Sequence, residues 1–130
     1  MSSPRMFRAQ CSSNNHFYKK GQWVYGSLQQ FKGYSIFQPD LKCWFGVYGK
    51  TVGQYTGLTD KNRVQIFEDD IVKFDGELCV VRWSDEECRF ELFDSYNLDH
   101  ALACWRSPLI EVVGNIHNNP ELLSEVKENE

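Results

Sequence analysis

Short runs of apolar residues alternate with polar residues along most of the chain, and turn-forming residues separate the runs. In residues 22–28, Trp23 and Tyr25 alternate with Val24 and Gly26. This period of two is typical of a β-strand with one more hydrated face. The other apolar runs of the first half cover residues 7–9, 34–37 and 41–48. The glycine and Pro-Asp turns between these runs predict an antiparallel meander of short strands.

The dipeptide Asp75-Gly76 lies between two alternating runs, residues 70–74 and 78–83. Both of its residues tolerate the positive φ angles of a type I′ turn, so it predicts a β-hairpin. A third antiparallel strand is predicted at residues 88–93, after a charged turn. Three successive strands of this kind resemble an SH3-like small barrel, an arrangement that does not by itself assign a function.

The last third of the sequence combines an irregular segment, a strand and a short helix. Four apolar residues fall at helical spacing in the irregular segment: Leu98, Ala101, Leu102 and Trp105. They predict that residues 94–108 form a variable loop with some helix. Residues 110–114 alternate as a last strand. A short helix is then predicted at Asn119-Pro120-Glu121, because Asn caps free amides, Pro fits the first helical position and Glu meets the positive end of the dipole.

Length and composition favour a single domain with a packed core. The chain has 130 residues, of which 42% are apolar and 15% aromatic, and it can bury roughly two thirds of its unfolded surface. We predict a mainly β fold in one compact unit, with a meander (1–53), a small barrel (54–120) and a short C-terminal helix with a frayed tail (121–130). No stretch approaches about 18 consecutive apolar residues and the start lacks a signal-peptide core. A cytoplasmic protein without membrane contact is therefore expected.

The net charge of −4 hides a polarity along the chain. Residues 1–65 carry nine Lys or Arg and two acids, a net charge of +7, whereas residues 66–130 carry five and sixteen, a net charge of −11. This polarity indicates either a nucleic-acid-binding half or two halves that attract each other within one fold or between subunits. Because Lys19-Lys20 is the only basic doublet, attraction between subunits or subdomains is favoured.

Aromatic residues are frequent in the strand-like segments of the first half. The eight in question are Trp23, Tyr25, Phe31, Tyr34, Phe37, Trp44, Phe45 and Tyr48. They could form a platform on which bases stack, as on single-strand-binding barrels. Aromatic residues at a period of two in a small β domain more often fill the core, and a core role is the expectation here.

Candidate catalytic and metal-binding groups are few and dispersed. The five cysteines are widely spaced and odd in number, which predicts reduced thiols and no zinc site, and the three histidines are isolated. Glu68, Asp69 and Asp70 are adjacent, but neighbouring strand residues point to opposite faces, so these acids converge only if the backbone turns sharply. We interpret Asp70 as a turn residue bonded to neighbouring amides. No enzymatic activity, metal or cofactor is expected; an enzyme using Asp70 or His117 is the remaining alternative.

Two blocks of the sequence carry a family resemblance. They are Gln54-Tyr-Thr-Gly-Leu58 with Asp60-Lys-Asn62, Ile66, Glu68 and Asp70-Ile-Val72, followed by Ile110-Glu-Val-Val-Gly-Asn-Ile116 and Asn119-Pro-Glu-Leu-Leu123. Together with Phe7-Arg-Ala9 and Trp23-Val-Tyr-Gly26, they resemble the YopX-like family of bacteriophage and prophage proteins. Arg63 and Asp69 depart from the family pattern, because Gly is usual at both positions. The resemblance implies a phage-encoded cytoplasmic protein, often oligomeric, with no established reaction.

The segment 54–72 joins the basic half of the chain to the acidic half. If Asn62-Arg63 keeps the tight turn that Gly normally permits, Arg63 must adopt a positive φ angle. Lys61 and Arg63 in this turn, together with Lys19-Lys20, are the candidate interaction residues. We expect a non-enzymatic, self-assembling interaction protein that forms homo-oligomers, with a host protein as a further partner. A nucleic-acid-binding small β-barrel is the alternative.

Overall fold

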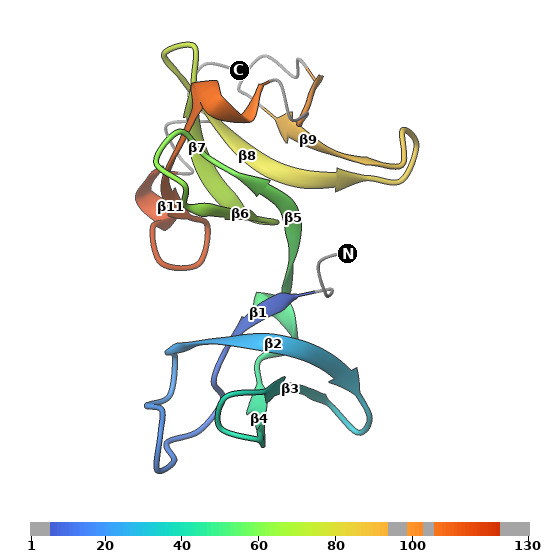
Figure 1. The fold of residues 1–130 in the computed structure, drawn as a ribbon, viewed down its shortest axis with the longest axis vertical. Coiled ribbons are helices and arrows are strands. Elements are labelled where there is room, and N and C mark those ends of the chain that lie inside the picture. Colours follow the sequence, from blue (N-terminus) through green and yellow to red (C-terminus); the bar gives the residue numbers. More distant parts are fainter. Residues whose placement is uncertain (1–5, 94–98, 103–105, 123–130) are drawn as a thin grey trace. The chain divides into compact units, whose positions relative to one another are not determined.

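The computed structural model describes residues 6–93, 99–102 and 106–122, and their regular structure is mainly antiparallel β (Figure 1). The strands are β1 (Phe7–Gln10), β2 (Trp23–Gln30), β3 (Tyr34–Gln38), β4 (Cys43–Val47), β5 (Gly53–Thr59), β6 (Gln65–Phe67), β7 (Asp70–Phe74), β8 (Glu77–Ser84), β9 (Arg89–Phe93), β10 (Asp99–Ala101) and β11 (Ile110–Asn115). Two short 3-10 helices are η1 (Gly49–Thr51) and η2 (Ser107–Leu109). The predicted mainly β fold is confirmed.

The chain divides between Tyr55 and Thr56 into two compact units, which we call unit 1 (residues 1–55) and unit 2 (residues 56–130). Strand β5 begins in unit 1 and ends in unit 2. Each unit has its own cluster of buried apolar side chains. The three-part division into residues 1–53, 54–120 and 121–130 stays a prediction.

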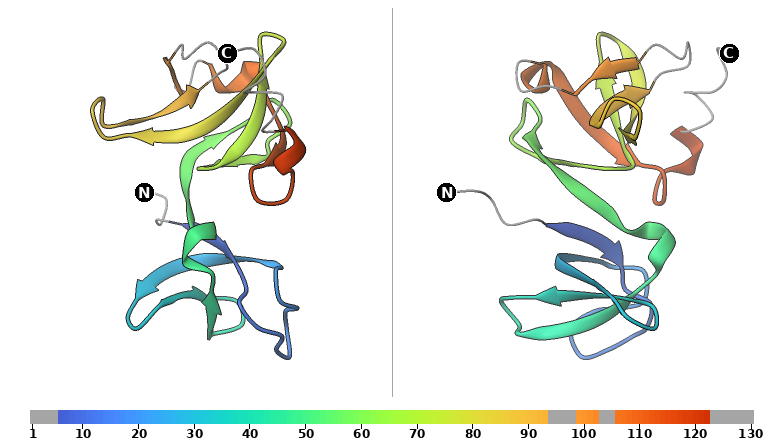
Figure 2. Two further views of the ribbon diagram at one scale, coloured as in Figure 1. Left: turned by 180° about the vertical axis from the view of Figure 1, so that it is seen from behind. Right: turned by 90° about the vertical axis from the view of Figure 1, so that its right-hand side faces the viewer.

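Unit 1 is built from strands in the order β4-β3-β2-β1-β5 (Figure 2). The chain beyond β1 turns towards β4, where Cys11 pairs with Val47 in an antiparallel bridge. Next to this bridge the amide of Tyr48 donates a hydrogen bond to the carbonyl oxygen of Gln10 at 2.9 Å. Because β1 and β4 lie at opposite ends of the β1–β4 ladder, these bonds close the four strands into a small barrel.

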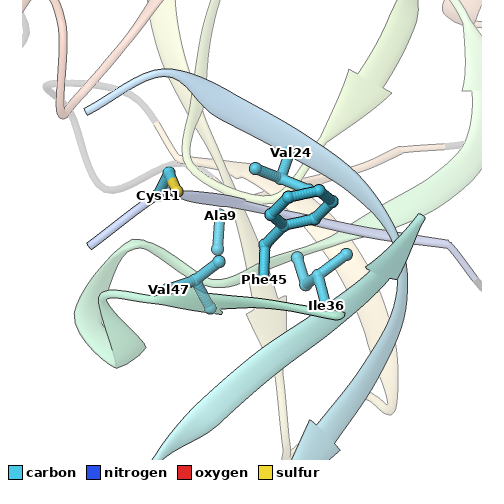
Figure 3. Packing of buried hydrophobic residues seen from close by; sticks show 6 residues of the cluster. All are labelled: Ala9, Cys11, Val24, Ile36, Phe45 and Val47. Carbon is cyan, nitrogen blue, oxygen red and sulfur yellow. The ribbon is translucent and has the colours of Figure 1, made fainter. Parts of the chain in front are cut away.

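Small aliphatic side chains fill most of the core of unit 1. Figure 3 shows the buried cluster, which consists of Ala9, Cys11, Val24, Ile36, Phe45 and Val47. Within β1–β4, the buried members of the cluster point to one face of the sheet, so the side chains next to them in sequence point to the opposite face. That opposite face, and not the core, receives many of the aromatic rings.

The expectation that the eight aromatic residues of the first half form the core is therefore wrong for three of them, while Tyr34 packs against the core. Phe45 is buried, whereas Tyr25 is 39%, Trp44 52% and Phe31 72% exposed. The remaining four, Trp23, Tyr34, Phe37 and Tyr48, are half-buried. Period-two patterning fixes which residues share a face, but it does not say which face is covered.

Unit 2 contains a sheet with the strand order β10-β9-β8-β7-β11. The β7–β8 hairpin turns at Asp75 and Gly76, whose φ angles of 54° and 77° are both positive. This geometry confirms the predicted hairpin. Both faces of the sheet are covered, because Val72 and Val81 pack into one cluster while Ile71 and Val80 pack into a second.

The prediction that residues 94–108 form a variable loop with some helix is wrong at residues 99–101, whereas the 3-10 helix η2 begins within the segment, at Ser107. Asp99–Ala101 form the strand β10, which pairs with β9 and places His100 opposite Leu92. Residues 94–98 and 103–105, with Leu98 and Trp105 of the helical pattern, lie outside the described residues. Pairing with β10 satisfies backbone groups along one side of β9, and this gain outweighs a weak helical periodicity.

The chain after β11 turns through residues 116–118 into a helical segment at residues 120–122. Leu122 packs against Ile71 and Val80. Asn119 precedes the helix as predicted, and its amide oxygen accepts a hydrogen bond from the backbone amide of Asn115 at 3.2 Å. The predicted tail at residues 123–130 lies outside the described residues.

The turn between β5 and β6 is organised by the carboxylate of Asp60, which is 5% exposed. One carboxylate oxygen accepts hydrogen bonds from the amides of Asn62 at 2.8 Å and Val64 at 2.9 Å. The other accepts from the amide of Val112 in β11, also at 2.9 Å. A single buried side chain thus fixes a local turn and also attaches it to a strand 52 residues further along the chain.

Arg63 has a φ angle of 64°, as its position in this turn predicts. A side chain at positive φ costs about 1 kcal/mol relative to Gly. We therefore expect Arg63→Gly to raise the midpoint of urea denaturation. Arg63→Ala is the matched control, because it removes the same exposed side chain and keeps the strained backbone. Equal midpoints for the two variants would contradict the strain.

Candidate functional site

The outward side of the barrel in unit 1 carries a group of rings around one guanidinium. We call Arg8, Trp23, Tyr25, Phe37 and Trp44 the outer aromatic face. They occupy the positions of β1–β4 that alternate with the buried core residues. The strand register places Tyr25 opposite Arg8 and Trp44 opposite Phe37. Directly opposed residues on one face of a sheet are in contact distance, so Tyr25 lies beside Arg8 and Trp44 lies beside Phe37 on the same outward side.

Two close contacts order the outer aromatic face. The guanidinium carbon of Arg8 lies 4.6 Å from the centroid of the Trp23 ring, a cation–π geometry. The rings of Phe37 and Trp44 lie 5.1 Å apart with an angle of 54° between their planes. Arg8 is only 7% exposed, whereas Trp44 is 52% exposed. The face thus combines a charge held beneath the surface with aromatic rings that present area to solvent.

The two units carry net charges of opposite sign. Residues 1–55 carry seven Lys or Arg and one acid, Asp40, a net charge of +6. Residues 56–130 carry seven Lys or Arg and seventeen acids, a net charge of −10. Five lysines of unit 1 are exposed: Lys19, Lys20, Lys32, Lys42 and Lys50. The boundary between the two units therefore separates basic from acidic residues almost as completely as a boundary after residue 65 does.

The four candidate interaction residues fall into two pairs, one in each unit. Lys19 and Lys20 lie in the loop between β1 and β2, where their backbone amides donate to the side-chain oxygens of Gln22 and Asn14 and their side chains are exposed. In unit 2 the ammonium group of Lys61 lies 3.9 Å from a carboxylate oxygen of Glu111. An exposed pair of this kind contributes little to stability.

Arg63 completes the pair in unit 2 and its side chain is exposed. Its backbone amide donates to the carbonyl oxygen of Asp60 at 3.0 Å, so the backbone of the turn is held while the side chain reaches solvent. The assignment of these four residues to an interaction surface stays a prediction. The outer aromatic face was not predicted as a site, although the alternation around Val24 was its signal in the sequence.

The adjacent acids Glu68, Asp69 and Asp70 lie in and next to a sharp turn between β6 and β7. Asp70 is 1% exposed and accepts a hydrogen bond from the amide of Phe67 at 2.8 Å, which confirms its interpretation as a turn residue. Asp69 has a φ angle of 75°, and one of its carboxylate oxygens lies 3.3 Å from Nε2 of His117. This pair joins segments 48 residues apart, so sequence spacing did not reveal it.

The described cysteines lie in the cores or at the surface and form no metal-binding cluster with these acids. Cys11 and Cys79 are 1% exposed and belong to the two cores, Cys43 is half-buried and Cys88 is exposed, all as thiols. In the part of the chain that the structure describes, no three His, Cys, Asp or Glu residues are close enough to share a metal ion. No helix within the same residues combines the length and hydropathy required to cross a membrane.

In unit 1, burial raises the pKa of the Tyr18 phenol, and the nearby Cys11 and Asp40 act in the same direction. The Tyr18 hydroxyl lies 3.1 Å from Oε1 of Gln38 and donates to it. The Tyr18 ring packs edge-on against Phe45 with 5.0 Å between centroids. Tyr18 therefore fastens the β1–β2 loop to the core of the barrel and leaves the lysines of that loop exposed.

Two small antiparallel β units, one basic with exposed rings and one acidic, define this chain as a mainly β protein. The model of the YopX protein family matches residues 6–124, and the chain belongs to this family. The chain is also similar to the crystal structure of protein EF1440 from Enterococcus faecalis, with 22% identity and a TM-score of 0.52. That likeness covers 94% of this chain and 99% of the other and shows the fold alone. No curated protein matches the sequence significantly.

Proposed function

We propose that the protein is a non-enzymatic interaction protein that assembles with further copies of itself. In this assembly the basic unit 1 of one copy faces the acidic unit 2 of the next. The observation that carries the proposal is the segregation of charge, +6 in unit 1 and −10 in unit 2. Unit 1 holds a single acid, Asp40, so its five exposed lysines cannot all be neutralised within it. Contact with the acidic unit of a neighbour would neutralise them.

A non-enzymatic role is supported by the way the buried acids are used. Asp60 and Asp70 are 5% and 1% exposed, and both accept hydrogen bonds from backbone amides in turns. The carboxylate of Asp69 is engaged by His117. A carboxylate whose lone pairs are taken by its own backbone holds the fold and offers little to a substrate.

Light scattering and native mass measurement at low and high salt test the assembly. Lys19→Glu combined with Lys20→Glu should lower the mass at low salt, and high salt should lower the mass of the unaltered protein, because salt screens exposed charges beyond about 10 Å at 0.1 M. The matched control is Lys73→Glu with Arg82→Glu, which changes the net charge equally but within the acidic unit 2. It should not lower the mass, because it adds negative charge to the unit that faces the basic unit 1 of a neighbour. A monomer whose mass is independent of salt would contradict the proposal.

The family resemblance extends the proposal to the origin of the gene, the cellular compartment and a further partner. We infer a phage or prophage gene whose product acts in the cytoplasm of the bacterial host and contacts a host protein in addition to its own copies. The support is the same separation of charge, which offers two chemically different surfaces for two kinds of partner. A pull-down from bacterial lysate that returns only further copies of this chain would contradict the host partner.

A further inference from the structure

We propose that the outer aromatic face of unit 1 binds single-stranded nucleic acid, with unpaired bases stacked on Trp44 and Tyr25 and phosphates held by the lysines of unit 1. This binding would use the same lysines of unit 1 as the assembly proposed above, but it also needs the aromatic rings, which that assembly does not. Three observations carry it: the exposure of the rings, the position of Arg8, and the sign of the charge of unit 1.

The rings of the outer aromatic face present stacking area at separate points. Trp44 is 52% exposed and Tyr25 39% exposed. They belong to β4 and β2, with β3 between them. The register aligns Trp44 through Phe37 with Ser27, which is two residues along β2 from Tyr25. Because neighbouring strands lie about 4.8 Å apart and a strand rises about 3.3 Å per residue, the backbone positions of Trp44 and Tyr25 are separated by roughly 12 Å. At this separation each ring can take a base of its own, and stacking on aromatic side chains accepts any base.

Arg8 places a positive charge against the Trp23 ring and next to Tyr25. Its guanidinium lies against Trp23 at 4.6 Å and the strand register sets it beside Tyr25. A charge that is only 7% exposed costs free energy unless it has compensating contacts, and the face of the Trp23 ring supplies one. Guanidinium planes and aromatic rings both stack on bases, and the charge attracts phosphate. The combination suits a ligand that is both aromatic and anionic.

The charge of unit 1 selects a polyanion as the occupant. A second copy docking through the same face would bring one unit of charge +6 against another, which is repulsive, and the acidic unit 2 of a second copy offers carboxylates but no unpaired bases to stack on the rings. A chain of phosphates is attracted instead, and the five exposed lysines of unit 1 can follow it. Duplex nucleic acid offers the same phosphates, but its bases are already stacked, so the rings favour a single strand.

Fluorescence anisotropy of labelled oligo-dT and oligo-rU at low salt tests this binding. Trp44→Ala should weaken binding by about tenfold, because stacking on one ring is of that order. Trp83→Ala is the matched control. Trp83 is 45% exposed and contacts one Phe ring at 5.1 Å, as Trp44 does, but it lies in the acidic unit 2. The control should bind as tightly as the unaltered protein, and affinity should fall as salt rises.

Several outcomes would overturn the proposal. They are absence of binding at low salt, equal weakening in the two Trp variants, equal competition by duplex of the same sequence, and a change of oligomeric mass in Trp44→Ala, which would mean that a second copy covers the face. Light scattering on the same samples separates this proposal from the previous one. Normal assembly without oligonucleotide binding removes only the nucleic-acid site, whereas oligonucleotide binding by a salt-independent monomer removes only the assembly.

Discussion

Replacement of Asp60 by Ala is expected to lower the free energy of unfolding by about 3–5 kcal/mol, a loss that few single substitutions cause. The carboxylate of Asp60 is nearly buried and accepts hydrogen bonds from the amides of Asn62, Val64 and Val112. Without this carboxylate, the partly buried amide of Val112 in β11 loses its hydrogen-bond acceptor. Urea denaturation followed by far-UV circular dichroism gives the change in free energy.

Asp60→Asn is the matched control for this substitution. Its side-chain oxygen can still accept from Asn62 and Val64, but its NH2 group would face the Val112 amide, where two donors meet. We therefore expect a loss of about 1–3 kcal/mol for Asp60→Asn, smaller than that of the Ala variant. Faster hydrogen exchange at Val112 should accompany the loss in both variants. A loss below about 1 kcal/mol in Asp60→Ala would mean that water replaces the carboxylate.

Replacement of Gly26 by Ala is expected to destabilise the protein by about 2–4 kcal/mol, an overpacking effect. A Cβ atom at Gly26 would overlap the backbone carbonyl oxygen of Phe37 in the neighbouring strand β3. Backbone atoms cannot move aside as a flexible side chain can, so β2 and β3 must separate at this point. The ladder between them, which aligns Ser27 with Phe37, would be disturbed.

Ser27→Ala is the control for Gly26→Ala, because Ser27 is the next residue of β2 and its side chain is exposed. It should change the free energy of unfolding by less than about 0.5 kcal/mol. Urea denaturation measures both variants. If Gly26→Ala is as stable as Ser27→Ala, the two strands can part locally without cost. Because Phe37 belongs to the outer aromatic face, Gly26→Ala should also weaken oligonucleotide binding.

Local turn chemistry was predictable because it depends on neighbouring residues alone. Asp75-Gly76 formed the predicted hairpin turn, and Arg63 has a positive φ at a position where the family usually has Gly. Asp70 accepts a hydrogen bond from the amide of a residue three positions earlier. Asp69, the second departure from the family pattern, also has a positive φ of 75°. The family itself was also recognisable from the two sequence blocks, and its model matches residues 6–124.

The candidate site was less predictable, because it depends on which face of the sheet is covered. The alternation of Trp23 and Tyr25 with Val24 placed the two rings on one side of β2 but gave equal reason to bury either side. Closure of β1 onto β4 resolved this choice by enclosing Val24, Ile36 and Val47. A small barrel has room for compact aliphatic side chains inside, so the larger rings remain outside.

The sequence by itself determined the β class, the turns, the family and the separation of basic from acidic residues, since each depends on composition or on residues close together in the chain. The tertiary structure alone decided the contacts between distant segments. It joined Asp60 to Val112, paired Asp69 with His117, turned residues 99–101 into an edge strand, and placed Arg8 against Trp23. The physical reason is that burial and strand pairing are gained only when remote segments meet, and these gains outweigh local preferences.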